Sequence, residues 1–400
     1  MPYYEITEAR LRRITLALGV GLLLGVFFYL GAGKRENSSF FQGDFPAFYA
    51  AAEIVWTGRG ADLYDFGLQR ALENRHWPDL GGGYYVYPYP PFFALLLSPF
   101  ASLSPLVAKG LASTCLFTAL LVALALARKS SAFVHRHFLF SLVYLLTFVP
   151  LQIAIVGVQN TALSILCFAL LHWASQNGRP LLTGLCASLL LYKPQFGAIV
   201  FLYLLGRGRR SELIGWSFGA LVMYFLGTLV LGVSWPLIWV RAAFRFGDIN
   251  FTINDYNMIS IAGVMYWVFD AVFGVGAPGL PWAYLLSVTL LAFSVWYVRR
   301  DEHRFVLVPH LALLFSPQTL FYDVAIAIYC LMRDLRPSDP SDFKRLAAIW
   351  IYGVIAFLLR DLVSFPLFSL LLLAILWLHF RRMNELIPVR GFLASPPQSP

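Results

Sequence analysis

One polar stretch near the N-terminus holds carboxylates in a setting that suits acid–base chemistry. Residues 43–65 read GDFPAFYAAAEIVWTGRGADLYD, and the chain of 400 residues has only 21 acidic residues in all. The carboxylates of this stretch are Asp44, Glu53, Asp62 and Asp65. Asp44 lies just after the first long apolar run, where a carboxylate at an aqueous cavity mouth can take a proton from an acceptor hydroxyl. The alternative is structural, with Asp44 as the N-cap of a helix that begins at Phe45 and has Pro46 in its first turn.

The other acidic residues of this stretch favour structural roles. Asp62 and Asp65 flank Tyr64 in a turn that follows two glycines, and capping of the next helix is the favoured role of Asp65. Both are retained as candidate substrate-binding residues. Glu53 falls on the helix that follows Asp44 and is expected to be solvated.

Four basic side chains are candidates for binding an anionic group such as a phosphate: Lys193, His310, Arg241 and Arg245. Lys193 interrupts an apolar stretch at the sequence YKPQ, and His310 lies inside another apolar run. A buried charge is costly without a function, so we expect a functional role for Lys193, and His310 is a candidate donor to a phosphate. The alternatives are snorkelling of Lys193 to the interface and a satisfied structural histidine at position 310. Arg241 and Arg245 would bind either a phosphate or anionic lipid head groups.

Aromatic, proline and amide side chains supply the remaining candidates. A strip of tyrosines and prolines precedes the second apolar run: Tyr84, Tyr85, Tyr87, Pro88, Tyr89, Pro90 and Pro91. Such a strip is typical of an interfacial aromatic belt, or it forms a wall on which a sugar ring or an isoprenoid stacks. Amides recur at expected outer helix ends, as in the lining of a polar cavity: Gln159, Asn160, Gln195 and Gln318.

The composition indicates that membrane helices position these residues. The chain is 59% hydrophobic and 13% charged, with a mean hydropathy of +0.69, whereas a soluble domain carries about 25% charged residues. The apolar runs do not alternate as barrel strands do, so we predict an all-α polytopic membrane protein. The net charge of +9 lies in short patches typical of cytoplasmic loops, not of a nucleic-acid groove. The four cysteines lie inside apolar runs, and we expect no metal and no cofactor.

The basic clusters predict about twelve crossings with both ends in the cytoplasm. A first helix over residues 14–32 leads into an external loop, 34–90, that carries the candidate site. Within this loop, two interfacial amphipathic helices are expected, at 44–56 and 66–76. The run at 92–103 is too short to span a bilayer and is predicted to be interfacial or re-entrant.

The later part of the chain continues this pattern. Residues 138–156 are predicted as one crossing and 234–256 as a second external loop. Two interrupted apolar segments are expected to be hairpins of short helices, with tips at 193–195 and 316–318, and broken helices are typical of binding sites in membrane proteins. Residues 1–385 are assigned to one multi-pass domain and 386–400 to a polar, proline-containing cytoplasmic tail.

The order of these motifs resembles glycosyltransferase family 87, which holds polyprenol-phosphate-mannose-dependent α-mannosyltransferases of the GT-C superfamily. The stretch at 43–65 resembles the first external loop of that family. The matching residues, in order over about 40–325, are Asp44-Phe45, Tyr49, Ala51-Ala52, Gly58, Leu63-Tyr64-Asp65, Tyr89-Pro90-Pro91, Val158-Gln159-Asn160 with the family's glycine displaced to Gly157, Lys193-Pro194-Gln195, Asn257, Ser260 and Gly263 with one residue inserted, Ser316-Pro317 and Tyr322-Asp323.

This resemblance implies a GT-C-like bundle and a sugar transfer on the external face of the plasma membrane. Mannose would pass, with inversion, from a polyprenyl-phosphate donor to a glycolipid or glycan acceptor. Asp44 would be the general base, and the four basic candidates would stabilise the leaving phosphate. By the same resemblance, the substrate-binding residues also include Tyr49, Tyr89, Asn257, Tyr322 and Asp323. Tyr87 is added to them from the aromatic strip. The alternatives are a transporter or flippase of a lipid-linked saccharide, and a membrane scaffold without catalysis.

Overall fold

The described part of the chain is helical. The computed structural model describes these residues: 10–21, 43–78, 85–274, 276–299 and 302–391. They form helices joined by turns, and their only β-type pairing is an isolated bridge between Met258 and Leu320. The prediction of an all-α protein is confirmed for these residues. The first predicted helix, 14–32, is helical up to residue 21, and its remainder lies outside the described residues.

The helices follow one another with short connections. In the first half they are helix 10–21, α2 (Phe45–Trp56), α3 (Phe66–His76), α4 (Pro91–Leu97), α5 (Pro105–Arg128), α6 (Ala132–Arg136), α7 (Phe138–Thr147), α8 (Val149–Val156), α9 (Thr161–Gln176), α10 (Pro180–Ser188) and α11 (Pro194–Arg207). In the second half they are α12 (Arg210–Leu231), α13 (Trp235–Asn254), α14 (Ile261–Phe273), α15 (Gly276–Val298), α16 (Val308–Phe315), α17 (Val324–Arg333), α18 (Pro340–Val363) and α19 (Leu367–Gly391). The 3₁₀ turns are η2 (Gly60–Asp62), η4 (Ser98–Ser102), η5 (Leu189–Tyr192), η6 (Asp255–Asn257), η7 (Glu302–Leu307) and η8 (Phe321–Asp323).

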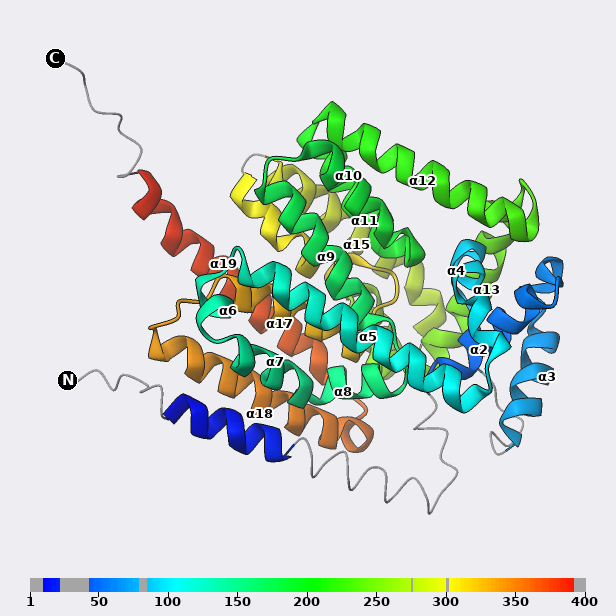
Figure 1. Ribbon diagram of the computed structural model, residues 1–400, viewed down its shortest axis with the longest axis horizontal. Coiled ribbons are helices and arrows are strands. Elements are labelled where there is room, and N and C mark those ends of the chain that lie inside the picture. The colour runs from blue at the N-terminus through cyan, green and yellow to red at the C-terminus, as the bar shows by residue number, and fades with distance from the viewer. Residues whose placement is uncertain (1–9, 22–42, 79–84, 275, 300–301, 392–400) are drawn as a thin grey trace.

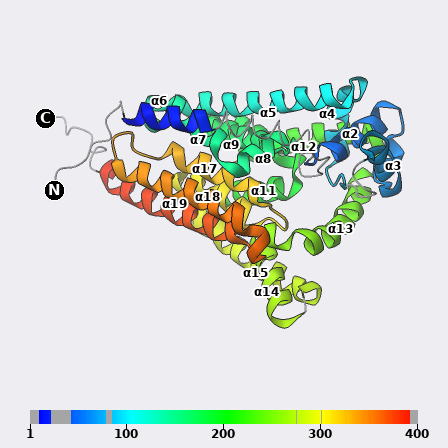
Figure 2. The same cartoon turned by 90° about the horizontal axis from the view of Figure 1, so that it is seen from below.

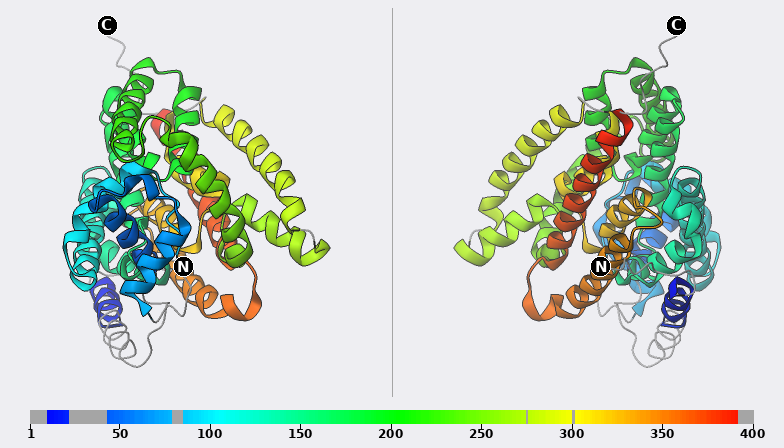
Figure 3. Two further views of the ribbon diagram at one scale, coloured as in Figure 1. Left: turned by 90° about the vertical axis from the view of Figure 1, so that its right-hand side faces the viewer. Right: turned by 90° about the vertical axis from the view of Figure 1, so that its left-hand side faces the viewer.

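The helices of the candidate loop gather at one end of the molecule. Figure 1 shows α2, α3 and α4 at the right-hand end of the long axis, with α6 and the end of α19 at the left. The long helices α5 and α12 connect the two ends. Figure 2 shows α13 leading from the α3 end to α14 and α15, and Figure 3 shows α15 standing apart from the bundle along part of its length. The candidate loop is therefore a cap on one end of the bundle.

Three helices in the described residues are long and apolar enough to cross a membrane. They are α5, α12 and the stretch Pro278–Val298 of α15, and a fourth crossing results if α7 and α8 count as one bent span. These helices expose apolar side chains, such as Leu106 at 82% and Leu229 at 76% exposure. Water would not tolerate so many exposed apolar side chains, whereas lipid does. The protein is a membrane protein, and the number of about twelve crossings is not confirmed.

One sequence-based element prediction was wrong, and a second predicted element is bent. Residues 234–256 were expected to form a loop but form α13, which docks on the tyrosine–proline strip through a hydrogen bond from Trp239 Nε1 to the Pro88 carbonyl oxygen, 2.9 Å. The predicted crossing at 138–156 is bent by 74° where α7 meets α8 at Phe148, because Pro150 follows within the first turn of α8 and starts a new helix there.

Other element predictions are confirmed. The helices expected at 44–56 and 66–76 are α2 and α3, and 92–103 forms only the short elements α4 and η4. Both predicted hairpins are present, with breaks before α11 and before α17. The last helix, α19, continues beyond residue 386, and 392–400 lie outside the described residues.

Glycines allow α10 and α12 to pack closely at their starts. A Cβ atom on Gly184 would lie 1.8 Å from the backbone oxygen of Glu212, and one on Gly215 would lie 2.0 Å from that of Leu181. Backbone atoms cannot give way as a flexible side chain does. Small residues at such positions are the usual means by which membrane helices approach one another.

We therefore expect Gly215→Ala to destabilise the protein by about 1–3 kcal/mol, the usual cost of overpacking. The control is Gly110→Ala on α5, where a Cβ meets no atom within 4 Å, and which is expected to be neutral or stabilising by up to about 1 kcal/mol. Thermal and denaturant unfolding of the purified proteins in detergent measures both. Equal stability of the two variants would contradict the packing described here.

Candidate active site

Four candidate residues occupy the N-cap positions of four helices. They are Asp44 of α2, Asn160 of α9, Lys193 of α11 and Asp323 of α17. None of these four side chains caps its own helix with a hydrogen bond. Their contacts, described below, are with one another and with neighbouring helix ends. We refer to these four residues as the helix-start cluster.

A close contact between two glycines positions Asp44. Gly43 has φ +54°, and a Cβ atom on it would lie 2.3 Å from the carbonyl oxygen of Gly157. The Asp44 N–H donates to that same oxygen over 3.1 Å, which fixes the start of α2 against the end of α8. The next residue, Val158, has φ +54°, which is strained for a β-branched side chain. This turn directs Gln159 towards Asp44.

The Asp44 carboxyl is available for chemistry. The backbone oxygen of Asp44 accepts from the Phe48 N–H over 3.1 Å, but its side chain makes no cap hydrogen bond. Gln159 donates a hydrogen bond to the carboxyl instead. Burial raises the pKa of Asp44 to about 6, although the Gln159 hydrogen bond and the nearby Lys193 charge act in the opposite direction. The capping alternative therefore does not account for this side chain.

Lys193 and Asp323 form a buried ion pair beside Asp44. The Lys193 Nζ lies 3.0 Å from both carboxylate oxygens of Asp323, and the side chains are 5% and 4% exposed. Thr161 Oγ1, at the start of α9, donates to Oδ1 of Asp323 over 2.7 Å. The partner of Lys193 lies 130 residues further along the chain, and the sequence did not indicate it.

Tyrosine and amide groups complete this region. Tyr89 and Tyr322 lie near enough to Asp44 to be affected by its charge, and burial together with that charge holds the pKa of Tyr89 well above its ordinary value. Asn160 is buried beside Tyr89. Within the described chain, its amide atoms and Oε1 of Gln159 have no well-formed hydrogen bond. Buried amide atoms that lack a well-formed hydrogen bond are groups that a polar ligand satisfies.

The structure does not bring His310 to the helix-start cluster. His310 Nε2 lies 3.3 Å from Nδ1 of His379, whose Nε2 lies 2.7 Å from the Asp334 carboxylate. Asp334 follows α17 and Asp323 precedes it, so these residues are separated by the length of that helix, about 15 Å. This contact agrees with the alternative of a structural histidine at position 310.

Two tyrosines of the candidate set have hydroxyl groups bonded to the backbone. The Tyr49 hydroxyl donates to the Leu103 carbonyl over 2.8 Å, and the Tyr87 hydroxyl donates to the Pro90 carbonyl over 3.2 Å. Both rings are buried. They hold the loop helices and the strip together.

The remaining acidic residues of the loop have structural contacts. Asp65 accepts two N–H groups in the first turn of α3, over 2.9 and 3.1 Å, which confirms the predicted cap. Asp62 forms an exposed ion pair with Arg59 over 3.0 Å. Glu53 is not simply solvated, because it pairs with Arg75.

Candidates on α13 and its neighbours form a second polar group. Gln318 accepts from Asn250 over 3.2 Å, Asn254 donates to Asn250 over 2.8 Å, and Asn257 donates to Asn254 over 3.5 Å. The same helix carries two exposed cations, and one of them, Arg245, stacks 4.8 Å from the Phe66 ring centre of α3. Those cations are Arg241 and Arg245. Gln195 is half-buried in the first turn of α11.

Sequence reasoning missed Gln69 and Glu73 of α3. Gln69 Oε1 accepts from the Tyr87 N–H over 3.1 Å, and Glu73 Oε2 accepts from the Tyr85 N–H over 2.8 Å. Burial and, to a smaller extent, the charge of Asp44 raise the pKa of Glu73 to about 8. A spacing of four residues places both side chains on one face of a helix. This spacing was the sequence feature that could have identified them as a pair. Their burial is a tertiary effect that this spacing does not indicate.

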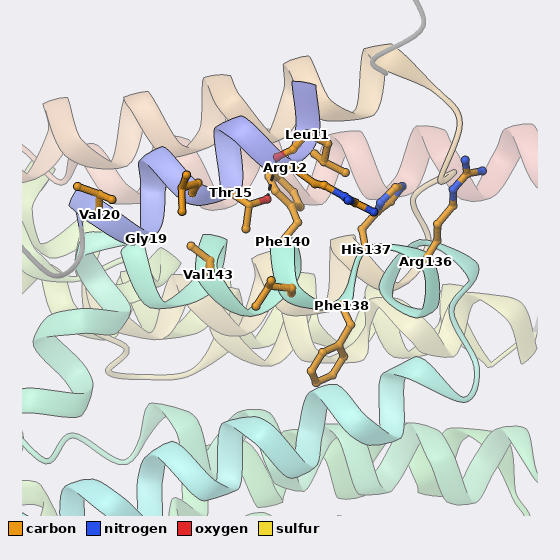
Figure 4. Close-up of a pocket in the computed structure, with 12 residues that line it drawn as sticks. Leu11, Arg12, Thr15, Gly19, Val20, Arg136, His137, Phe138, Phe140 and Val143 are labelled. Atoms are coloured by element: carbon orange, nitrogen blue, oxygen red, sulfur yellow. Dashed lines mark hydrogen bonds between the residues drawn. The ribbon is translucent and has the colours of Figure 1, made fainter. Parts of the chain in front are cut away.

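A separate groove lies away from these residues. Figure 4 shows it between helix 10–21 and α7, with Arg12, Arg136 and His137 at one end. Its volume is about 630 Å³, and none of the candidate residues lines it. In the residues described, no group of three or more His, Cys, Asp or Glu side chains forms a metal site. The expectation that no cofactor takes part stays a prediction.

The fold combines membrane-capable helices with a polar cluster at helix breaks. This combination is typical of membrane enzymes and of transporters. Comparison of the sequence with known families narrows this class. The profile of glycosyltransferase family 87 matches residues 87–317, more than half of the chain, so the chain belongs to this family of membrane glycosyltransferases. The matched segment includes Tyr89, Asn160 and Lys193 but neither Asp44 nor Asp323. No curated protein and no solved structure shows significant similarity to the chain.

The buried ion pair gives a stability prediction. Lys193→Ala leaves the Asp323 carboxylate buried without its cation, and we expect a loss of about 3–5 kcal/mol. The double variant Lys193→Ala/Asp323→Asn is expected to recover part of this loss, because it removes the uncompensated charge. As a control, Arg59→Ala breaks the exposed pair with Asp62 and is expected to cost about 1 kcal/mol or less. Denaturant unfolding measures all three, and a Lys193→Ala variant as stable as the control would refute the structural role of the pair.

Proposed function

We propose that the protein transfers a sugar, mannose by the family resemblance, from a polyprenyl-phosphate donor to an acceptor hydroxyl on a glycolipid or glycan. The observation that carries this proposal is the helix-start cluster. Four helix N-termini converge on one site, and helix N-termini favour anions. A lipid-phosphate donor brings an anion to this site, and Asp44 supplies a base beside it.

In the proposed step, the acceptor O–H gives its proton to the Asp44 carboxylate. The acceptor oxygen bonds to the anomeric carbon on the face opposite the phosphate, which inverts that carbon. The bond from the anomeric carbon to the phosphate oxygen breaks, and its electron pair leaves with the polyprenyl phosphate. Negative charge thereby moves from Asp44 to the leaving group, so a site with a fixed cation and helix dipoles stabilises the transition state.

Two sets of cations are candidates for the phosphate. Lys193 lies within the cluster, and its ion pair with Asp323 holds it in place. Arg241 and Arg245 are exposed on α13, which packs over the strip that ends at Tyr89. We propose that Lys193 faces the phosphate from within the bundle and that the two arginines face it from α13. His310 is not proposed for this role, because it lies at the other end of α17.

The position of α12 supports an external site. Its end at Val230 packs against Gly60 of the candidate loop, and its start follows the basic residues Arg207, Arg209 and Arg210. Basic residues favour the cytoplasmic side. A helix of 22 residues spans about 33 Å, so the Asp44 end would lie at the external face of the plasma membrane.

The decisive test is Asp44→Asn. Asn is nearly isosteric but does not accept the proton, so base catalysis predicts a loss in turnover of roughly 10²–10⁴-fold or more. Because burial disfavours the charged form of Asp44, removal of that charge should leave the thermal stability at neutral pH equal or higher. Transfer from labelled polyprenyl-phosphate mannose to a panel of acceptors measures turnover. A folded variant that keeps more than about a tenth of the wild-type rate would exclude Asp44 as the base.

The pH dependence gives a second test of the base. A carboxylate acts as a base only when deprotonated, so kcat/KM should fall tenfold per pH unit as the pH drops below about 6, the pKa of Asp44. An unperturbed aspartate would place this limb near pH 4. The Gln159 hydrogen bond lowers the pKa, so Gln159→Leu should move the limb to higher pH. Glu73→Gln is the control, and a limb that disappears in that variant would assign the titration to Glu73 instead.

A further inference from the structure

A basic cavity lies between the turn that precedes α10 and the turn that precedes α12. It has a volume of about 380 Å³ and is lined by arginine and hydroxyl side chains. The arginines and hydroxyl residues are Arg179, Arg209, Arg210, Ser175, Thr183 and Ser211. None of these belongs to the helix-start cluster or to the other candidates. This combination of charges and hydroxyl donors suits a phosphate oxyanion.

The packing of two helices creates this cavity. The close contacts at Gly184 and Gly215 hold the first turns of α10 and α12 side by side (Figure 1). Arg179 precedes the first turn of α10, and Arg209 precedes the first turn of α12. The two helix starts therefore direct their unsatisfied N–H groups, and the positive ends of their dipoles, towards the same region. A Cβ on either glycine would force these starts apart.

The single carboxylate in the lining does not cancel its positive charge. Glu212 is buried and faces Arg207 over 3.2 Å and Arg209 over 3.5 Å. Arg207 does not line the cavity, and it balances Glu212 from behind. The charges of Arg179 and Arg210 thus remain in excess in the cavity. Arg179 and Arg210 are exposed, so a ligand can reach them.

The cavity lies at the membrane surface opposite to the Asp44 end. α12 contains an apolar window of 18 residues that is long enough to cross a membrane, and only 17% of this window is buried. Its far end contacts the Asp44 loop at Gly60, and its 22 residues match the roughly 30 Å thickness of a bilayer core. The start of α12 therefore lies at the level of lipid head groups, beside a helix face that is covered by lipid chains. Basic pockets in this position bind anionic lipid head groups.

We propose that this cavity binds the phosphate of an anionic phospholipid from the leaflet opposite to the Asp44 site. Arg179 and Arg210 bind the phosphate, Arg209 supplies further charge, and Ser211 donates a hydrogen bond. The acyl chains lie along the exposed apolar face of α12. This site does not depend on the proposed function, since none of its residues takes part in the transfer.

Lipid titration of the purified full-length protein tests this proposal. Phosphatidylglycerol added in mixed micelles is expected to raise the Tm with saturation, whereas phosphatidylcholine is not. The double variant Arg179→Gln/Arg210→Gln should weaken the apparent affinity for phosphatidylglycerol at least about tenfold. The matched control is Lys129→Gln/Lys344→Gln, which removes two exposed charges outside the cavity and should keep the wild-type affinity.

Further measurements distinguish a lipid phosphate from inorganic phosphate. They also allow for a double variant that does not fold. Inorganic phosphate at the same concentrations should not reproduce the shift, and a saturable shift with phosphate alone would overturn the lipid assignment. If the double variant does not fold, Arg179→Gln and Arg210→Gln are tested singly, each with an expected loss of about threefold. Native mass spectrometry should show a retained phosphatidylglycerol that the variants lose. Wild-type affinity in the cavity variants, or an equal loss in the control, would refute the site.

Discussion

The requirement that a buried charge be paired governs the arrangement of this molecule. An unpaired lysine or aspartate in a low-dielectric interior costs several kcal/mol, and the pair of Lys193 with Asp323 meets that requirement at two helix breaks. Thr161 joins the start of α9 to the same carboxylate. The contact of Gly43 with Gly157 then brings the start of α2 to this point. The breaks in these helices are therefore the means by which polar groups reach the bundle end.

The same arrangement explains why Asp44 has the properties of a base. Burial pushes its pKa upward, because a low-dielectric surrounding disfavours the charged form. The hydrogen bond from Gln159 and the charge of Lys193 oppose this, and the pKa settles at about 6. A carboxylate with this pKa is ionised at neutral pH and still basic enough to accept a proton. For Glu73, the hydrogen bond from the Tyr85 N–H does not offset burial, and with a pKa of about 8 this side chain stays protonated there.

Sequence signals within a few residues predicted the helices and their breaks well. They did not predict contacts between residues that lie far apart in the chain. The Asp65 cap, the helices at 45–56 and 66–76 and the break at Lys193 follow from caps, periodicity and prolines within a few residues. The partner of Lys193 was not predictable in this way, because Asp323 lies 130 residues away. His310 was grouped with Lys193 because both interrupt apolar runs, and an apolar run does not indicate depth in the bundle. The α13 helix was taken for a loop because its charges resemble those of a polar connection.

The wide spacing of the helix-start cluster along the chain has a consequence for how the protein is made. Its members come from residues 44 to 323, and the contacts of Thr161 and Lys193 with Asp323 close loops of 162 and 130 residues. Closing such loops costs chain entropy before any favourable contact forms. Contacts between residues that are far apart in the sequence therefore form late. During synthesis, Lys193 cannot pair with Asp323 until α17 has emerged and entered the bundle. The site is thus assembled only after most of the chain has been inserted, and an incomplete chain does not contain it.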